Sequence, residues 1–397
     1  MRHGWLVNGL LAAASIGLGL GLCELAFVPL LPRVPLKLHE ALHPGLRVFA
    51  QSSKAGLEPR DYVALLGDSY AQGFGDWLLA ADPERNGEFH SAHLVHDWTG
   101  RDVVSFGASG AGSLRGLVAE PIARSEWANA GARVHLDPPR DALIYFYEGN
   151  DLDDNLKDLR LRYEPDHDPQ RLRDSAYFRA FLDEVVIGRN PLHLEALHHR
   201  PWDDLFFLRG LPRLIGFALR RWRGDHEGRR SWPPGRVNRA RVGGRELALP
   251  DGLQAPALEL DAAELDRALW VFEESLARLH DAWPRTRLIV VYVPSPLASY
   301  DLASEQVSIQ SYEGRGSEYP AALVTQRSDA IAKRIGEIAR DEGAGFVNAR
   351  PLLREASAGA LVHGPRDWEH FNRRGYEALA RADLQALGAA GPPARVR

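Results

Sequence analysis

Short runs of mostly apolar residues recur along the chain and alternate with longer amphipathic stretches. The runs occupy residues 62–66, 103–106, 142–147, 288–293 and 345–347. Because they are mostly apolar and do not alternate with polar residues, they are typical of strands buried on both faces of a sheet. The helical stretches cover residues 92–99, 114–128, 262–283, 321–342 and 374–387. This order predicts a three-layer α/β/α sandwich around a five-stranded, mainly parallel sheet.

Two of the predicted helices have clear end signals and a continuous apolar stripe. In the stretch 262–283, Asp261 can cap the first turn and Glu264 can reach back to it. The stripe then follows at steps of four and three residues, at Leu265, Leu269, Phe272, Leu276 and Leu279. In the stretch 321–342 the stripe is formed by isoleucines, and Gly343 is placed to end the helix.

The amino-terminal segment differs from the rest because residues 4–23 contain no charged side chain. Together with the apolar continuation to Leu31, it is long enough to span a bilayer. Arg2 and His3 precede it, which favours a cytoplasmic amino end. We expect residues 1–31 to be an uncleaved signal anchor that leaves the main body outside the cytoplasm. A cleaved signal peptide is the alternative, although no convincing small-residue cleavage site follows; a buried helix is a third interpretation.

The remaining chain divides by composition into a tether, a domain and an insertion. Residues 32–60 contain four prolines without a period, which predicts a tether. Residues 61–151 and 259–390 hold the alternating pattern, and residues 152–258 interrupt it as an insertion between the third and fourth strands. Within the insertion, residues 203–223 mix apolar residues with arginines and are interrupted by Pro212. This segment either packs on the domain with its arginines in solvent or docks on an anionic membrane surface.

Overall composition is that of an ordinary folded protein, with 45% hydrophobic and 25% charged residues. The net charge of −5 gives no indication of nucleic-acid binding. Cys23 is the only cysteine, so an intrachain disulfide and a cysteine-based metal site are both excluded.

Residues suited to catalysis follow the first three predicted strands. Ser69 stands after Gly67 and Asp68, at the carboxyl end of a parallel strand, where α/β proteins place their chemistry. Its backbone N–H lies among unpaired donors that can hold an anion. Gly107 lets the backbone approach a ligand, and Asn150 offers a neutral amide donor suited to an oxyanion. Each motif alone is also typical of a turn.

A candidate base lies near the carboxyl end of the chain. His370 stands three positions after Asp367, so the carboxylate can reach the imidazole, hold its tautomer and stabilise the imidazolium. Asn372 is placed to cap the helix that follows. A decoy is the serine of Gly107-Ala108-Ser109: a nucleophile elbow needs glycine two places after the serine, and residue 111 is alanine, so we expect Ser109 to be a turn residue.

Two further polar clusters are assigned no chemistry. Asp151, Asp153 and Asp154 lack the glycine and distal glutamate of a calcium loop, so we expect a solvated acidic turn. Glu195 and His199 would share a helical face close to His193 and His198, but no third ligand stands out, so no metal site is predicted.

Taken in order, Gly67-Asp68-Ser69, Gly107, Asn150 and the Asp367–His370 pair resemble the motif blocks of the SGNH/GDSL hydrolase superfamily. Val291-Tyr292-Val293-Pro294-Ser295 is similar to a segment of its membrane-tethered bacterial members, which include O-acetyl esterases and polysaccharide O-acetyltransferases. Two positions depart from the usual pattern: Ser105 replaces a frequent asparagine, and Glu148 replaces a usual glycine.

The resemblance implies a flavodoxin-like fold of the SGNH type and a two-step acyl transfer. Ser69 is then the nucleophile, His370 the base and Asp367 its partner. The oxyanion is bound by the N–H groups of Ser69 and Gly107 and by the Asn150 side chain. Neither a metal nor an organic cofactor is needed.

The resulting expectation is a serine esterase held in the inner membrane by a single span, with its catalytic domain on the periplasmic side. Its substrate would be O-acyl, such as acetyl, groups of a carbohydrate or envelope polymer. An O-acyltransferase that uses the same residues, with a membrane acyl-donor partner, is the alternative. A catalytically silent polysaccharide-binding or assembly protein is the third interpretation.

Overall fold

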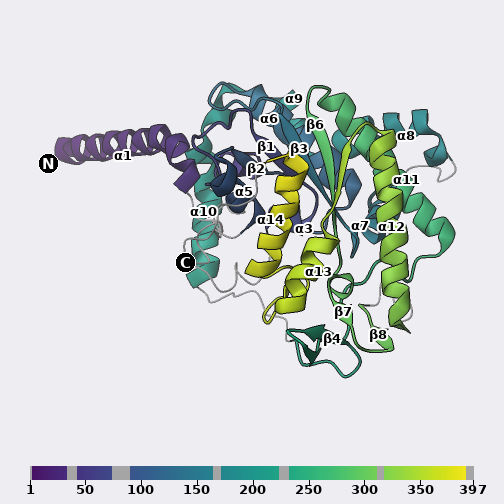
Figure 1. Ribbon diagram of the computed structural model, residues 1–397. Coiled ribbons are helices and arrows are strands. Elements are labelled where there is room, and N and C mark those ends of the chain that lie inside the picture. The colour runs from purple at the N-terminus through teal and green to yellow at the C-terminus, as the bar shows by residue number, and fades with distance from the viewer. Residues whose placement is uncertain are drawn as a thin grey trace.

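The central sheet of the molecule contains five parallel strands in the order β10-β6-β3-β1-β2 (Figure 1). The computed structural model describes residues 2–33, 43–73, 90–163, 171–222, 232–310 and 317–389. The strands are β1 (Val63–Leu66), β2 (Val103–Ser105), β3 (Asp141–Tyr147), β6 (Arg287–Val293) and β10 (Gly345–Asn348). Each coincides with a predicted apolar run to within one residue, so the sheet prediction is confirmed.

Successive strand residues point into two separate cores, as the pleat of a sheet requires. In β1, Ala64 and Leu66 lie in one core, while Val63 and Leu65 lie in the other. The first core is covered by α6 (Glu120–Ala130), α11 (Ala262–Ala282) and α12 (Ala321–Asp341). The second is covered by α5 (Ser91–Thr99) and α14 (Arg373–Leu387). Helices therefore lie on both faces, and the three-layer α/β/α class is confirmed.

The predicted helix ends are also confirmed. Asp261 and Glu264 form a reciprocal capping box at the start of α11, with bonds of 2.8 and 3.1 Å. Gly343 adopts a φ of +70° directly after α12, which a residue with a side chain rarely adopts. The predicted helix over 114–128 consists of a π-helical segment, η3 (Leu114–Ala119), followed by α6.

The chain between β3 and α11 is mostly helical and ends with two antiparallel strands. Its helices include α7 (Asp151–Asp158), α8 (Ser175–Phe181), α9 (Pro191–Leu197) and α10 (Phe206–Trp222). Between them lie two π-helical segments, η4 (Leu159–Tyr163) and η7 (Leu182–Ile187), and two 3-10 helices, η6 (Arg171–Arg173) and η8 (Pro201–Asp204). The interruption predicted at Pro212 is wrong, because α10 continues through it; a proline forfeits one helical donor without always breaking the helix.

Further short elements surround the carboxyl half of the sheet. Strands β4 (Arg239–Val242), β5 (Arg245–Ala248) and β7 (Asp301–Leu302) form a small sheet. Strands β8 (Gln306–Ser308) and β9 (Glu318–Pro320) pair with each other. Between β6 and β7 lies η9 (Leu297–Ser299), and α13 (Arg350–Gly359) follows β10.

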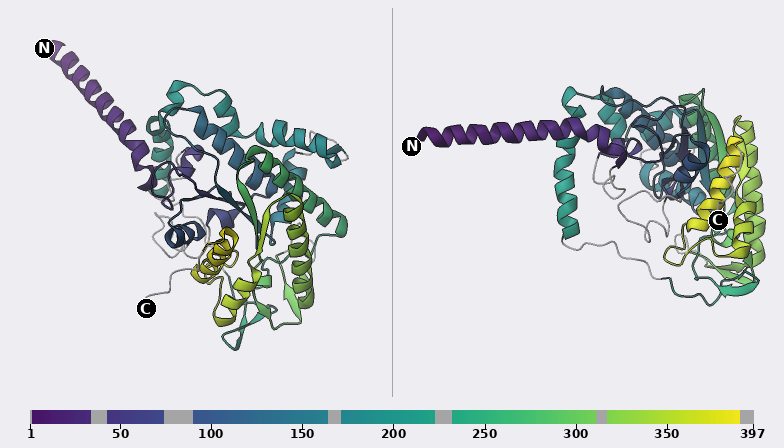
Figure 2. Two further views of the ribbon diagram at one scale, coloured as in Figure 1. Left: turned by 45° about the horizontal axis from the view of Figure 1, so that its top comes forward. Right: turned by 60° about the vertical axis from the view of Figure 1, so that its left-hand side comes forward.

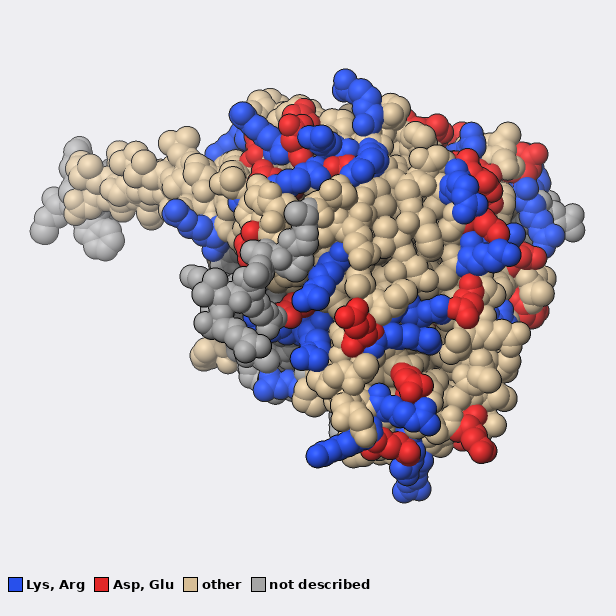
Figure 3. Space-filling model, viewed as in Figure 1, with Lys and Arg blue, Asp and Glu red and all other residues tan. Residues whose placement is uncertain are grey.

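The amino-terminal helix α1 (Arg2–Leu30) projects from the body as an isolated rod (Figure 2). The segment Val7–Arg33 is long and apolar enough to cross a membrane, and only 11% of its apolar 18-residue window is buried. Its surface in Figure 3 is largely uncharged, whereas the body carries both signs of charge interspersed. The carboxyl end of α1 packs on the body, since Val28 of α1 is buried. Leu31, the first residue of the following turn η1 (Leu31–Arg33), is also buried.

The segment expected to be a tether is partly built into the domain. Residues 34–42 lie outside the described residues. From His43 onward, however, the chain forms η2 (Pro44–Val48), and Leu46, Val48 and Phe49 are buried in the first core. The tether prediction is wrong for this stretch, because its scattered apolar residues find partners on α6 that a search for periodicity does not reveal.

Candidate active site

Ser69 begins the short helix α3 (Ser69–Gln72) directly after β1. The turn that carries it depends on Gly67, whose φ is +132° and whose position leaves only 2.6 Å between an added Cβ and the carbonyl oxygen of Tyr145. Asp68, fully buried, caps α3 by accepting the Tyr70 N–H at 2.8 Å. The sequence Gly-Asp-Ser therefore combines a backbone that only glycine adopts easily with a helix cap that presents the serine.

The structure brings Asp367 and His370 to Ser69 from the other end of the chain. Ser69 Oγ lies 2.9 Å from His370 Nε2, and His370 Nδ1 lies 2.7 Å from Asp367 Oδ2. With the Nδ1 proton donated to Asp367, Nε2 is left to accept the hydroxyl proton. Asp367 is itself oriented, since its other oxygen accepts the backbone N–H groups of Glu369 and His370.

The electrostatics of this chain of bonds favour a charge on the imidazole. Burial lowers the pKa of His370, but the hydrogen bond and charge of Asp367 raise it, and its pKa lies above the ordinary value. Burial raises the pKa of Asp367, but its bonds to His370 and nearby N–H groups lower it, and its pKa lies below the ordinary value. An ionised Asp367 therefore stabilises the imidazolium that forms when His370 takes a proton.

Tyr70 fixes α3 against the loop that carries the histidine, a role that the sequence did not reveal. Its hydroxyl donates to the carbonyl oxygen of Glu369 at 2.6 Å. Its ring lies 5.3 Å from the His370 ring and 4.9 Å from the Phe371 ring, between centroids. The only sequence signal was an aromatic residue directly after the serine, which does not by itself indicate a partner 299 positions away.

Gly107 packs directly on the helix of the nucleophile. An added Cβ would lie 2.3 Å from the backbone nitrogen of Gln72, so only glycine fits without displacement. Its N–H donates to Ser105 Oγ at 3.2 Å, and Ser105 in turn donates to the carbonyl oxygen of Ala71 at 2.5 Å. Ser105, which stands where asparagine is usual, thus accepts the Gly107 N–H with its hydroxyl, and an oxyanion would have to share or displace this bond. The role of Gly107 as an oxyanion donor stays a prediction.

Asn150 lies at the amino end of α7 without capping it through its side chain. Among the described residues, its Oδ1 is buried without a hydrogen-bond partner. The strand before it meets α3 through Tyr147, whose ring centroid lies 4.4 Å from that of Tyr70. The segment is therefore close to α3. The unpartnered Oδ1 is an acceptor, so an oxyanion at this place would be bound by the amide N–H₂ of the same side chain.

Glu148, the second departure from the usual pattern, is a buried hub. Its carboxylate accepts Ser328 Oγ at 2.6 Å, Ser295 N and Oγ at 2.8 Å each, and the hydroxyl of Tyr292. Burial raises its pKa, while these donors act in the opposite direction. The carboxylate ties the end of β3 to β6 and α12, and so positions the loop that begins at Gly149.

The solvated acidic turn predicted at Asp151, Asp153 and Asp154 is wrong, because all three side chains are buried in the first turn of α7. Asp151 Oδ2 accepts the Tyr147 N–H at 2.8 Å. Burial, together with the nearby Asp68 charge, raises the pKa of Asp151, and burial raises that of Asp154 to about 7. Carboxylates can be buried here because a raised pKa lets them hold a proton.

The remaining candidates have other partners. Ser109 is exposed in a turn, and its N–H donates to Gln72 Oε1 at 2.8 Å, as expected of a turn residue. Asn372 caps α14 by accepting two backbone N–H groups, as predicted. His193 pairs with Glu126 at 2.6 Å, whereas Glu195 pairs with His43 at 2.8 Å. Among the described residues, no group of three or more potential ligands could hold a metal ion.

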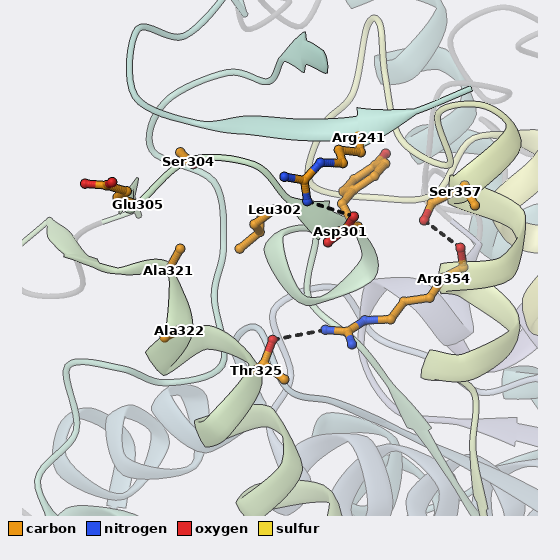
Figure 4. Close-up of a pocket in the computed structure, with 12 residues that line it drawn as sticks. Arg241, Asp301, Leu302, Ser304, Glu305, Ala321, Ala322, Thr325, Arg354 and Ser357 are labelled. Atoms are coloured by element: carbon orange, nitrogen blue, oxygen red, sulfur yellow. Dashed lines mark hydrogen bonds and ion pairs between the residues drawn. The ribbon is translucent and has the colours of Figure 1, made fainter. Parts of the chain in front are cut away.

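A cavity of about 660 Å³ lies between the small sheet, α12 and α13 (Figure 4). Its charged walls are internally bonded: Arg241 pairs with Asp301 at 3.2 Å, and Arg354 donates to Thr325 at 3.3 Å. None of the triad or predicted oxyanion donors lines it. The cavity is therefore separate from Ser69 and His370.

Several solved structures share a distant likeness with the chain. They include an extracellular lipase from Streptomyces rimosus, with 15% identity, a TM-score of 0.35, and coverage of 82% of this chain and 97% of that one. An acetylxylan esterase from Geobacillus stearothermophilus has 11% identity, a TM-score of 0.34, and coverage of 84% and 97%. No protein-family model and no curated protein sequence matches the chain. At such identities and TM-scores, function has to be argued from the site.

Proposed function

We propose that this protein is a serine-dependent ester hydrolase. The observation that carries the proposal is the unbroken series of Asp367, His370 and Ser69, joined by contacts of 2.7 and 2.9 Å. Nucleophile, base and orienting carboxylate are the three parts that acyl transfer through a serine requires. They lie at the carboxyl edge of a parallel sheet, where α/β enzymes bind their substrates.

The reaction follows from the geometry. His370 Nε2 takes the hydroxyl proton as Ser69 Oγ bonds to the ester carbonyl carbon, and the carbonyl oxygen becomes an oxyanion. We assign its stabilisation to the N–H groups of Ser69 and Gly107 and to the Asn150 side chain. The imidazolium then protonates the leaving alcohol as the ester bond breaks. Water, deprotonated by the same nitrogen, attacks the acyl-serine and releases the carboxylic acid and Ser69.

The setting of the reaction is the second part of the proposal. α1 anchors the protein in the inner membrane, and the catalytic body faces the periplasm. The exposed apolar length of α1 and Arg2 at its amino end support this orientation. We propose O-acyl groups of a carbohydrate or envelope polymer as substrates, in keeping with the motif resemblance. Transfer to a sugar hydroxyl would use the same acyl-serine.

The full-length protein in detergent tests the chemistry with a fluorophosphonate probe and an aryl acetate. We expect labelling and turnover that disappear in Ser69→Ala and persist in Ser109→Ala, which removes an exposed serine next to the site. The enzymatic proposal would be refuted if Ser69→Ala were still labelled, or if the unmodified protein did not turn over the aryl acetate. Acetate release from an acetylated polysaccharide, compared with acetyl transfer between sugars, separates hydrolysis from transfer.

A further inference from the structure

Large apolar side chains are exposed in one region of the body. Outside α1, nine such residues are exposed among those the structure describes, and seven of them come from residues 194–222. Those seven are Leu194, Leu197, Trp202, Leu205, Ile215, Leu219 and Trp222. Scattered exposed apolar residues are normal, but a concentration in one segment indicates an interaction surface.

The outer half of α10 presents the clearest part of this surface. Ile215, Leu219 and Trp222 follow one another at steps of four and three and therefore lie on one face of the helix. They are 53%, 48% and 83% exposed. On the opposite face, Phe206 and Gly210 are buried. The helix thus turns an apolar stripe outward, the reverse of a surface helix that packs its apolar side on the core.

The polar side of α10 begins with an arginine that is paired within the protein. Arg209 donates to Glu195 at 2.7 Å and lies 3.3 Å from Asp203. These ion pairs hold the first turns of α10 against the preceding segment. The apolar stripe, in contrast, is exposed and needs a partner.

A buried carboxylate joins α10 to α1. Glu24, near the end of α1, accepts the Leu208 N–H at 3.0 Å, so it occupies the amino end of α10, where a negative charge is favourable. Its other oxygen pairs with Arg133, which also donates to the Glu24 backbone carbonyl at 2.9 Å. The rings of Phe27 and Phe207 meet at 5.7 Å. These contacts fix the direction in which α1 leaves α10.

α1 and α10 lie crosswise to each other. In the right-hand view of Figure 2, α1 extends away from the body, and α10 lies across it on the side of the body from which α1 leaves. A bilayer that surrounds the projecting part of α1 would therefore have its surface along α10. Because the stripe faces outward from the body, it would face that bilayer.

We propose that α10 is an interfacial helix whose stripe of Ile215, Leu219 and Trp222 inserts into the surface of the bilayer spanned by α1. The inference rests on the proposed membrane anchoring. An apolar stripe with arginines on the other faces is the composition of helices that lie in the headgroup region, and tryptophan is enriched at that depth. Held at two places, the body keeps one orientation relative to the membrane and does not swing about α1.

The test uses the full-length protein in vesicles of phosphatidylcholine and phosphatidylglycerol, labelled with an environment-sensitive fluorophore. The native exposed Cys23 of α1 reports the anchor. In a Cys23→Ser background, Leu219→Cys reports the stripe. Leu323→Cys is the matched exposed control, because it belongs to α12, a helix that lies across the body from α1 and α10 (Figure 1). At positions 23 and 219 we expect the fluorescence emission to shift to the blue and to be quenched by quencher-bearing lipids. At position 323 we expect neither the shift nor the quenching.

The outcomes separate the two proposals. A blue shift with lipid quenching at position 23, but a water-like spectrum at 219, overturns the interfacial helix and keeps the anchor. Water-like spectra at both positions overturn the anchor as well. A third outcome is a blue shift at position 219 that lipid quenchers do not quench and that disappears when the protein is diluted among more vesicles. This result would show that a second copy of the protein covers the stripe, and it also overturns the proposal.

Discussion

The contact between Gly107 and α3 makes a sharp prediction for Gly107→Ala. The new Cβ would lie 2.3 Å from the nitrogen of Gln72 and 2.5 Å from the carbonyl carbon of Ala71. Ordinary contact begins at 3.4 Å, so the loop after β2 and the helix of Ser69 must separate by about 1 Å. Both neighbours are backbone atoms, which cannot move aside as a flexible side chain would.

The expected effect is catalytic more than structural. A displacement of about 1 Å between reacting groups costs on the order of 10²-fold in rate, and loss of one oxyanion donor costs about 10²–10³-fold. We therefore expect kcat/KM for an aryl acetate to fall at least ~10²-fold, or about 2.7 kcal/mol. Fluorophosphonate labelling of Ser69 should slow in parallel. It should not disappear, because His370 still accepts the hydroxyl proton of Ser69.

Gly56→Ala is the matched control. Its added Cβ would have a single neighbour, the carbonyl oxygen of Glu58 at 3.8 Å, which is ordinary contact. This variant should keep its activity, and thermal unfolding of both variants separates lost activity from lost fold. If Gly107→Ala retained kcat/KM within about threefold of the unmodified protein, close packing on α3 would not be what sets the geometry of Ser69.

Three further predictions concern titration and burial. We propose neutral His370 as the base, so kcat/KM should rise with pH through an apparent pKa above 6.5, the ordinary value. Asp367→Asn should lower both that pKa and kcat, the latter by about 10⁴-fold, and an unchanged pH profile in this variant would contradict the proposal. Glu148→Ala leaves four donors without their acceptor and should destabilise the fold by about 3 kcal/mol or more in urea unfolding, so an unchanged midpoint would speak against the hub. Burial raises the pKa of Asp383 from 3.8 to about 8, while the Tyr145 hydroxyl at 2.6 Å opposes the shift. Since this folded-state pKa lies above the unfolded value, stability should fall by up to ~1.4 kcal/mol per pH unit as the pH rises towards about 8, and Asp383→Asn should remove this slope in melts compared across that range.

The sheet and the triad were accessible from sequence because their signals are local. A buried parallel strand is apolar throughout, and the three-residue spacing of Asp367 and His370 already places a carboxylate beside an imidazole. The oxyanion donors were placed by the same reasoning, at the ends of β2 and β3. The structure confirms the contact between Ser69 and His370, whereas the roles of Gly107 and Asn150 stay predictions.

Part of what was missed depends on contacts between distant residues. Glu148 reaches Ser328, 180 positions away, and neither position has a pattern that identifies the other. The burial of Asp151 has a local cause that its residue type does not show: its carboxylate accepts the N–H of Tyr147, four residues earlier, where the chain passes from β3 into α7. Residues 44–49 belong to a stretch, residues 32–60, whose four scattered prolines predict a tether, although Leu46, Val48 and Phe49 are buried in the first core.

The bond between Ser69 and His370 joins residues 301 positions apart. Such a contact can form only after nearly the whole chain has been synthesised, so a nascent chain carries the serine long before it carries its base. A truncated or incompletely folded product would hold an ordinary, unactivated hydroxyl. Esterase activity in this chain would therefore report completed folding, and it would arise only after the body has left the ribosome.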